Sequence, residues 1–276
     1  MGVLNVRNDI IHVYLKLIVL NIKMTTLNSN RENNLDSKVN EFIQAIQKYL
    51  GHRRYKFFET IVSFLIITLQ AITLFNLIYT YENSSFFYLI LVLVIAYVAT
   101  DLVNGLVHMY MDNNTYYSCL VGPYIAAFHL HHAKSIYQIR HPLRVYFDES
   151  GTKFWLLVYL FILVSIQLNV HLGVFLNVGL VAFGIFSSVA EVSHYWCHNA
   201  TEKNRLILWL QNNHVLLSKE HHKAHHCSDN TQYAFLNGVT DPLLNLIAGY
   251  YYKGYKNYAD KHTRIYIQRT LHSRPK

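Results

Sequence analysis

The residues of this chain whose type and spacing best suit a chemical role are paired histidines. Three pairs are separated by four residues: His194 with His198, His221 with His225, and His222 with His226. On a helix, side chains four residues apart share one face. Imidazole nitrogens bind iron, zinc and copper, whereas harder ions prefer carboxylates and water. The spacing therefore favours a metal centre built mainly from imidazoles.

Acidic side chains accompany the histidines in two apolar stretches, again at helical spacing. One stripe holds Asp101, Asn104, His108 and Asp112, and a second holds Glu191, His194 and His198. An acidic residue in a membrane helix costs about 2.5–3.5 kcal/mol on insertion scales and usually marks a functional position. We expect His108 to be a ligand, Asp112 to be a ligand or an acceptor that orients an imidazole, and Glu191 to support catalysis from behind the ligands. Asp101 is expected further out, as support; helix-packing hydrogen bonds are the alternative for these acids.

Further histidines lie between and after these stretches. Residues 128–132 read Phe-His-Leu-His-His and are expected on a loop, whereas Lys219 to His226 is expected to be a helix that can approach two metals. A catalytic zinc needs three protein ligands, and the chain offers roughly eight to ten candidates, so two metals are favoured. No H-E-x-x-H or G-x-S-x-G string occurs. A histidine-rich surface tract that binds metal adventitiously is the alternative.

The composition indicates which elements must position these residues. The chain is 52% hydrophobic and 14% charged, well below the roughly 25% charged residues of a soluble protein. Four stretches approach the length of about 20 apolar residues that crosses a bilayer: Phe57 to Tyr79, Phe86 to Val107, Phe154 to Val170, and Leu172 to Trp196. The three cysteines contain no C-x-x-C pair and are expected to be small buried residues. We predict an all-α integral membrane protein with four transmembrane helices.

The distribution of positive charge predicts the topology. Every Lys and Arg lies before residue 57, between residues 108 and 153, or after His198, and neither short connection between paired spans contains one. Positive charge accumulates on the cytoplasmic side, so both termini and a histidine-rich cap holding the dimetal centre are expected there. The net charge of +8 is spread along the chain without a nucleic-acid-binding motif, so no nucleic-acid partner is expected.

Three regions are expected along the chain. Residues 1–56 form an N-terminal segment, with a short apolar run from Ile10 to Ile22 and a polar, disordered stretch from Arg31 to Lys38. Residues 57–255 form the membrane domain, in which Arg205 to Leu217 is expected to lie along the membrane surface. Residues 256–276 form a basic tail that is expected to contact anionic headgroups.

The joint pattern of these motifs resembles the lipid desaturase family of plasmanylethanolamine desaturase, Kua and CarF proteins, with the plant plastid phosphatidylglycerol desaturase as a distant branch. The strings that carry the resemblance are Asp101-x-x-x-Gly-Leu-Val-His108 followed by Asp112, His131-His132, His194-x-Trp-x-His198, Asn213-His-Val-Leu-Leu and His221-His-x-x-His-His226. The likeness extends from about Phe57 to Tyr250.

The resemblance implies a ligand set. Eight histidines match both branches: His108, His131, His132, His194, His198, His222, His225 and His226. Weaker candidates are His129, from the loop segment, and His141, His214 and His221, which match the plasmanylethanolamine side of the family. The chain departs from that side at Met109 (usually Trp), before His131 (usually Glu), and at Asn230 (usually His). These departures leave the expected fold and metal centre unchanged and bear on which substrate the protein uses.

The resemblance also implies an activity. We expect an oxygen-dependent desaturase with two iron ions, which zinc can replace on expression, and O2 as co-substrate. Its substrate would be a phospholipid chain, with vinyl-ether formation in plasmanylethanolamine as the first guess, and its electron donor a cytochrome b-type protein or ferredoxin. The alternatives are a fatty acyl desaturase or lipid hydroxylase with the same centre, and a membrane metal or haem electron carrier. The expected location is the endoplasmic reticulum in a eukaryote or the inner membrane in a bacterium.

Overall fold

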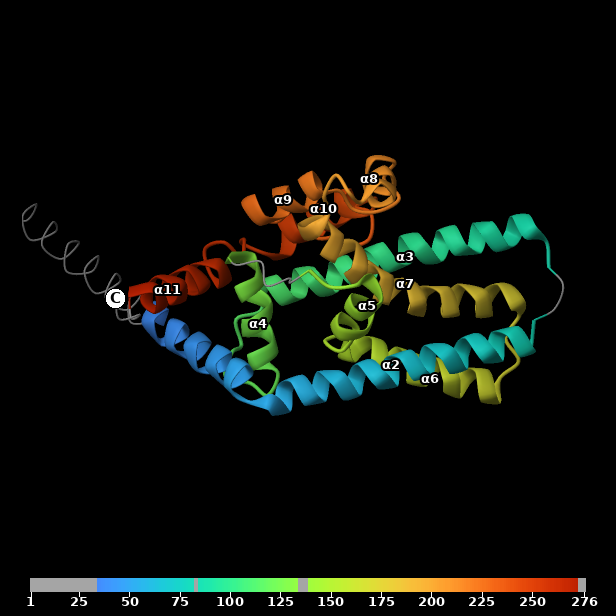
Figure 1. The fold of residues 1–276 in the computed structure, drawn as a ribbon, viewed down its shortest axis with the longest axis horizontal. Coiled ribbons are helices and arrows are strands. Elements are labelled where there is room, and N and C mark those ends of the chain that lie inside the picture. The colour runs from blue at the N-terminus through green and yellow to red at the C-terminus, as the bar shows by residue number, and fades with distance from the viewer. Residues whose placement is uncertain (1–33, 82–83, 134–138, 273–276) are drawn as a thin grey trace, which may run out of the picture.

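A computed structural model describes residues 34–81, 84–133 and 139–272, and these residues form helices joined by turns and short loops, with no strand among them. Residues 1–33, including the apolar run from Ile10 to Ile22, lie outside the described residues. The molecule is elongated, with a bundle of long helices at one end and shorter helices at the other (Figure 1).

Three helices are long and apolar enough to cross a membrane: α2 (Arg53–Tyr79), α3 (Phe86–Asn113) and α7 (Val174–Asn199). In Figure 1 they run side by side with α6 (Phe154–Asn169), and α3 packs along α7 while α2 packs along α6. Short connections join α2 to α3 and α6 to α7 at the end of the bundle opposite the shorter helices. The expected helices and hairpins are therefore present.

The third expected span differs from a simple crossing. The helix α6 has 16 residues, about 24 Å at 1.5 Å per residue, which is short for a bilayer core of about 30 Å. It follows α5 (Pro142–Ser150) after a bend of 86°, and the two helices pass as a span only together. Gly151 forms the bend where a Cβ would lie 2.3 Å from the carbonyl oxygen of Glu59, so α5 and α6 press directly on α2.

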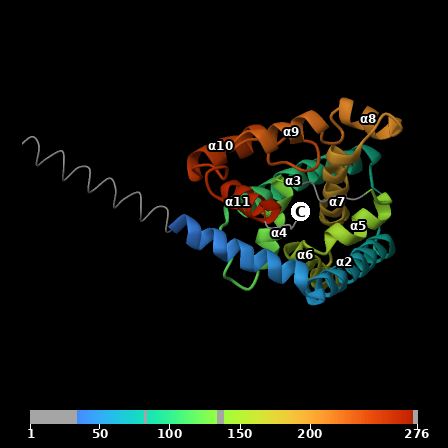
Figure 2. The same cartoon turned by 60° about the vertical axis from the view of Figure 1, so that its left-hand side comes forward.

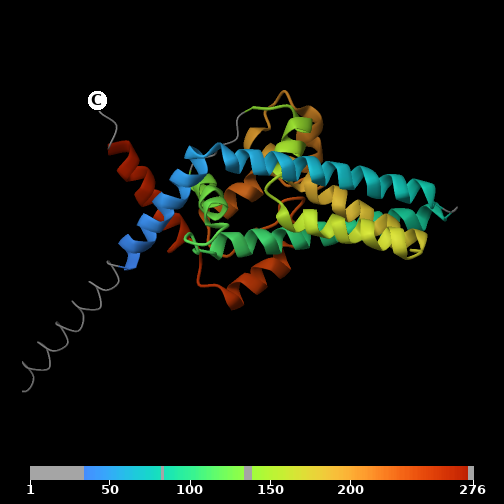
Figure 3. The same cartoon turned by 90° about the horizontal axis from the view of Figure 1, so that it is seen from below.

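The shorter helices gather at the other end and form a cap. Figures 2 and 3 show α4 (Gly122–Ala133), α9 (Lys219–Cys227), α10 (Asp241–Tyr251) and α11 (Ala259–His272) around the ends of α3 and α7, with α8 (Arg205–Asn212) beside them. A helix over residues 34–51, blue in Figure 1, packs Phe42 against Tyr117 and Tyr266 of this cap.

Two expectations about local structure were wrong. Residues 34–38, expected to be disordered, begin the helix over residues 34–51, because its apolar side is buried against the cap. The histidines of residues 128–132 lie on α4 and not on a loop; Ile125 and Ala126, one turn earlier, anchor that helix in the same apolar cluster. Of the cysteines, Cys197 is buried as expected, whereas Cys227 is exposed.

Candidate metal centre

The ends of two long helices place histidines at one edge of the apolar bundle. At about 1.5 Å per residue, His108 lies about 33 Å along α3 and His194 about 30 Å along α7. The apolar part of each helix therefore ends where its histidines begin. A bilayer core of about 30 Å would leave these side chains at the interface between lipid and cap.

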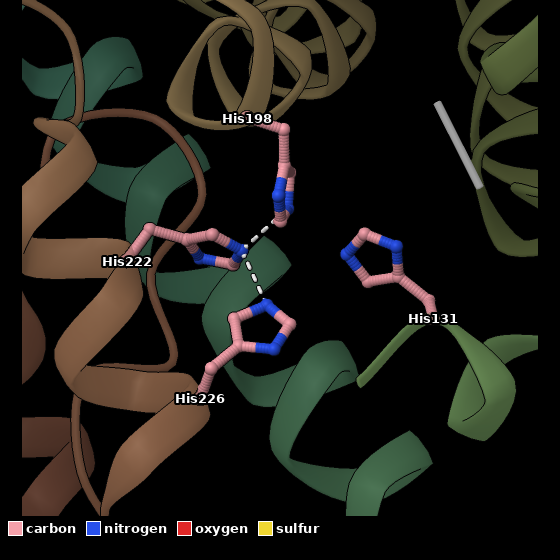
Figure 4. Close-up of side chains that lie close together, drawn as sticks. All are labelled: His131, His198, His222 and His226. Atoms are coloured by element: carbon pink, nitrogen blue, oxygen red, sulfur yellow. Dashed lines mark hydrogen bonds between the residues drawn. The ribbon is translucent and has the colours of Figure 1, made fainter. Parts of the chain in front are cut away.

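Three helices bring four of the expected ligands together, and we call this group the imidazole cluster. It consists of His131 on α4, His198 on α7, and His222 and His226 on α9, each with a ring nitrogen within 4.8 Å of one from every other member. Figure 4 shows the four rings directed toward a common space.

The nitrogen spacing within this cluster suits a bound cation. The Nε2 atom of His222 lies 2.9 Å from the Nε2 atoms of both His198 and His226, and 3.1 Å from that of His194. One neutral imidazole nitrogen can donate to only one of these three neighbours. Ligands held at about 2.05 Å from a metal are about 2.9 to 3.4 Å apart in octahedral or tetrahedral geometry. The cluster therefore has the dimensions of a ligand set.

A second group, which we call the aspartate cluster, lies beside the first. It consists of His108 and Asp112 on α3, His132 on α4 and His225 on α9. The Asp112 carboxylate lies 3.0 Å from His132 Nε2, 3.3 Å from His108 Nε2 and 3.4 Å from His225 Nε2. The clusters are adjacent, since the rings of His132 and His226 are 5.0 Å apart.

Backbone carbonyls fix the orientation of two rings in the aspartate cluster. His108 Nδ1 lies 2.7 Å from the carbonyl oxygen of Tyr233, and His225 Nδ1 lies 2.9 Å from that of Thr231. A carbonyl only accepts, so each Nδ1 carries a proton and each Nε2 faces Asp112. Ligand histidines in metal sites are commonly held in this way.

Asp112 provides the test of whether a metal fits. The residue is fully buried, and three imidazole nitrogens approach its oxygens at 3.0 to 3.4 Å. A buried carboxylate is costly without a positive partner, which here can be a metal ion or a protonated imidazole. Three imidazoles and one carboxylate form a donor set that suits iron or zinc. The residues present therefore fit a bound metal ion.

The protonation states of most of the cap histidines agree with a metal-binding role. Burial, and then neighbouring imidazoles, hold the pKa values of His131 and His222 well below the usual range and lower the pKa of His226 to about 3. These rings are neutral near pH 7 and can act as ligands. His132 differs because burial is outweighed by the charges of Asp112 and Asp260, which raise its pKa to about 9. In the absence of a metal, its proton balances Asp112.

A carboxylate stands behind His132 of the aspartate cluster, and another stands near His194, which borders the imidazole cluster. Asp260 lies 3.3 Å from His132 Nδ1 and pairs with Lys256 at 2.8 Å. Glu191 has an oxygen 3.7 Å from His194 Nδ1, and its other oxygen lies 3.0 Å from the buried amine of Lys153. Carboxylates behind ligand histidines raise their basicity. The lysines hold the two carboxylates in place.

The remaining expected ligands lie as follows. His194 borders the imidazole cluster, with its ring 4.5 Å from that of His222 and 5.0 Å from that of His131. None of the four weaker candidates belongs to either cluster. His129 contacts the Tyr117 hydroxyl and the Met111 carbonyl, and His141 caps the start of α5. His214 is exposed, and His221 bonds to Asp241.

Some residues of the site were missed by the sequence reasoning. The carbonyl groups of Thr231 and Tyr233 carry no side-chain signal, and Phe235 looks like any core residue. Asp260 was assigned to the basic tail, yet it lies on α11 against His132. The signal available in the sequence was an acid with a cation four residues before it, Lys256, and another four residues after it, Arg264. Asp101 lies away from both clusters and hydrogen-bonds the backbone of residues 236–240.

Comparison with known proteins agrees with the sequence motifs. The family model of the lipid desaturase domain matches residues 97–252, more than half of the 276 residues, and this range contains every member of both clusters. No match was found among curated proteins or among solved structures. The resemblance inferred from the histidine motifs is confirmed at the level of the family. On this evidence, the chain belongs to the lipid desaturase domain family.

Proposed function

We propose that this protein is an oxygen-dependent membrane lipid desaturase that holds two iron ions, one in each cluster, and introduces a double bond into a phospholipid chain. The observation that carries the proposal is the placement of two adjacent ligand groups at the edge of an apolar helix bundle, in a chain of the lipid desaturase family. An enzyme that oxidises lipid chains needs its metal centre at this edge of the membrane, where the chains can reach it.

The division of ligands supports two metals rather than one. Eight side chains form two groups of four, and each group meets the distance requirement of a single ion by itself. The helix α9 contributes His222 and His226 to one group and His225 to the other. One short helix therefore fixes the relative positions of both sites.

Bound iron would supply the activation of dioxygen and the removal of hydrogen from an unactivated C–H bond, chemistry that side-chain acids and bases do not perform. The protein residues hold and orient the centre. Asp112 contributes a negative charge that offsets part of the metal charge, while the carbonyls of Thr231 and Tyr233 fix the rings of His225 and His108. Phe235 packs against His108 and His194 and would exclude water from both rings.

The substrate would enter from the bilayer. The surfaces of α2 and α3 expose many large apolar side chains, as expected of faces that contact lipid tails. We propose an alkyl or acyl chain of a phospholipid as the substrate class, with plasmanylethanolamine as the first candidate because of the family resemblance. Desaturation and hydroxylation use the same oxidant, so analysis of the lipid product distinguishes them.

The distribution of Lys and Arg supports a proposed orientation of the protein in the membrane and a proposed class of electron donor. The connections at the far end of the bundle contain no Lys or Arg, whereas the cap is rich in both, and this asymmetry favours a cytoplasmic cap. A basic cap would attract an acidic electron carrier, such as a cytochrome b-type protein or ferredoxin. The membrane would be the endoplasmic reticulum in a eukaryote or the inner membrane in a bacterium.

Lipid analysis of cells with and without the chain tests the proposal. Wild-type protein should add double bonds to ether or diacyl phospholipids, and His225→Ala should abolish the product while the protein remains in the membrane. His171→Ala is a matched control, since His171 is exposed at the far end of the bundle. A haem absorption band in purified protein, or full activity of His225→Ala, would contradict the proposal.

A further inference from the structure

The segment from Thr231 to Asp241 connects α9 to α10 and contacts His108 and His225 of the aspartate cluster as well as His194, which borders the imidazole cluster. Its Tyr233 carbonyl accepts from His108, and its Thr231 carbonyl accepts from His225. Its Phe235 ring lies 4.2 Å from the rings of both His108 and His194. The position of this segment therefore sets the orientation of two rings of the aspartate cluster and supports the ring of His194 beside the imidazole cluster.

One carboxylate on α3 holds this segment. Asp101 Oδ1 accepts hydrogen bonds from the backbone N–H groups of Leu236, Asn237 and Gly238 at 3.0 to 3.3 Å. Its Oδ2 atom accepts from the N–H of Thr240 at 3.1 Å and from its hydroxyl at 2.7 Å. Asp101 is fully buried, so its charge is balanced by these five donors.

The backbone turn is shaped to present these donors. Gly238 has a φ of 86°, and a Cβ there would lie 3.0 Å from His221 Nε2, so only glycine fits without strain. Three successive N–H groups then converge on one oxygen, as in other anion-binding turns. Here the anion is a side chain of the neighbouring helix.

Two further bonds secure the segment on either side of Phe235. Asp241 Oδ1 accepts from the N–H of Ala234 at 3.0 Å, and the Ser193 hydroxyl donates to the Leu236 carbonyl at 2.9 Å. Ser193 immediately precedes His194 on α7. The segment is thus tied to α3, α7 and α10, and Asp101 supplies the largest share of the bonds.

We propose that Asp101 is a positioning residue for the metal centre: it fixes segment 231–241, and through that segment the rings of His108, His225 and His194. The inference rests on the proposed metal-binding function. Asp101 acts without touching a metal, through a segment that bonds two histidines of the aspartate cluster. Loosening the segment should therefore weaken metal binding chiefly at the aspartate cluster.

Three variants test this role. Asp101→Asn keeps the size of the side chain but turns an amide N–H₂ toward backbone donors, and it should lower metal affinity by about 10-fold, the lower end of the range for residues behind ligands. Thr240→Val removes one of the five hydrogen bonds and should have a smaller effect. Thr100→Val is the matched control, because this buried hydroxyl bonds only to the carbonyl of Ala96 on its own helix.

Two readouts on the purified full-length protein distinguish positioning from general stability. Hydrogen exchange of the metal-free protein should be faster in residues 231–241 of Asp101→Asn, with α3 and α7 unchanged. Titration with Co²⁺ should show weaker binding and an altered ligand-field spectrum at the aspartate cluster. Unchanged exchange in the segment, or wild-type Co²⁺ affinity in a folded variant, overturns the inference; wild-type protein that binds no metal refutes the proposed function instead.

Discussion

The ring of Phe235 stacks on the ring of His194, with centroids 4.2 Å apart and planes within 10° of parallel. The same side chain packs against His108, which belongs to the aspartate cluster. A single apolar residue therefore packs against one ring of the aspartate cluster and against His194 beside the imidazole cluster, and it is almost completely buried. Its removal would open a cavity bordered by histidines from both sides.

Replacing Phe235 by Ala should lower the free energy of unfolding by about 3–5 kcal/mol, the usual cost of removing a buried aromatic ring. The cavity would also admit water beside His108 and His194. Thermal or chemical unfolding in detergent measures the change. Phe64→Ala is a suitable control, because Phe64 is 65% exposed on the apolar surface of α2. Equal stability of the two variants would show that Phe235 does not pack as described.

His222 has the most central position in the imidazole cluster, since its Nε2 atom lies within 3.1 Å of three other imidazole nitrogens. We expect His222→Ala to remove the metal ion of this cluster and to leave the other in place, because His225 is unchanged. Elemental analysis of purified protein should then show about one metal ion fewer per chain.

The control for this experiment is again the exposed His171. His171→Ala removes the same side chain from the far end of the bundle and should retain the full metal content. Full metal content in His222→Ala would show that the four rings converge without forming a metal site.

The sequence predicts the bundle and most of the ligands because both depend on local patterns. Long apolar runs identify α2, α3 and α7, and spacing of four residues identifies the histidine pairs on α7 and α9. The pattern does not show how the histidines of these pairs are distributed between the two clusters. His222 and His226 remain a pair, whereas His225 joins His108 and His221 turns to Asp241.

The remaining features depend on contacts between distant segments. Residues 34–51 form a helix because a cap that is assembled much later in the chain covers its apolar face. The role of Asp101 depends on the backbone of residues 236–240, more than a hundred positions away. Backbone acceptors such as the Tyr233 carbonyl have no side-chain signature. Tertiary packing decides all three, and single-sequence patterns do not contain it.

Asp112→Asn tests the aspartate cluster. Asparagine has nearly the same shape but carries no charge, so the cluster loses the only carboxylate among its four members. We expect the metal of this cluster to be lost or bound at least 10-fold more weakly, and the lipid product to disappear. Metal titration and product analysis measure both effects. A variant with normal metal content and activity would exclude Asp112 as a ligand.

Lys153 and Glu191 form a buried ion pair at 3.0 Å behind His194. Lys153→Met should destabilise the protein by about 3–5 kcal/mol, because it leaves the carboxylate of Glu191 buried without a partner. The double variant Lys153→Met with Glu191→Gln removes both charges and should recover part of the loss. A double-mutant cycle of unfolding free energies gives the coupling. Additive effects would mean that the pair contributes no net interaction.

The pH dependence of stability should reflect a buried hydrogen-bonded chain beneath α11. The Tyr117 hydroxyl lies 2.9 Å from His129 Nδ1 and 3.1 Å from His262 Nδ1. Burial, and then the charge of His129, lower the pKa of His262 to about 4, below the value of about 6.5 in the unfolded chain. Between these values the unfolded state binds more protons, so the contribution is complete above pH 6.5 and is lost as the pH falls toward 4.

His262→Gln keeps a hydrogen-bonding side chain but removes the titration. Compared with wild-type protein, this variant should lose less stability between pH 6.5 and pH 4, by up to about 1 kcal/mol per pH unit. Unfolding midpoints measured at several pH values in the same detergent give the difference, in which the other histidines cancel because both proteins contain them. Parallel curves for the two proteins would mean that His262 is not held in its neutral form by burial in the cap.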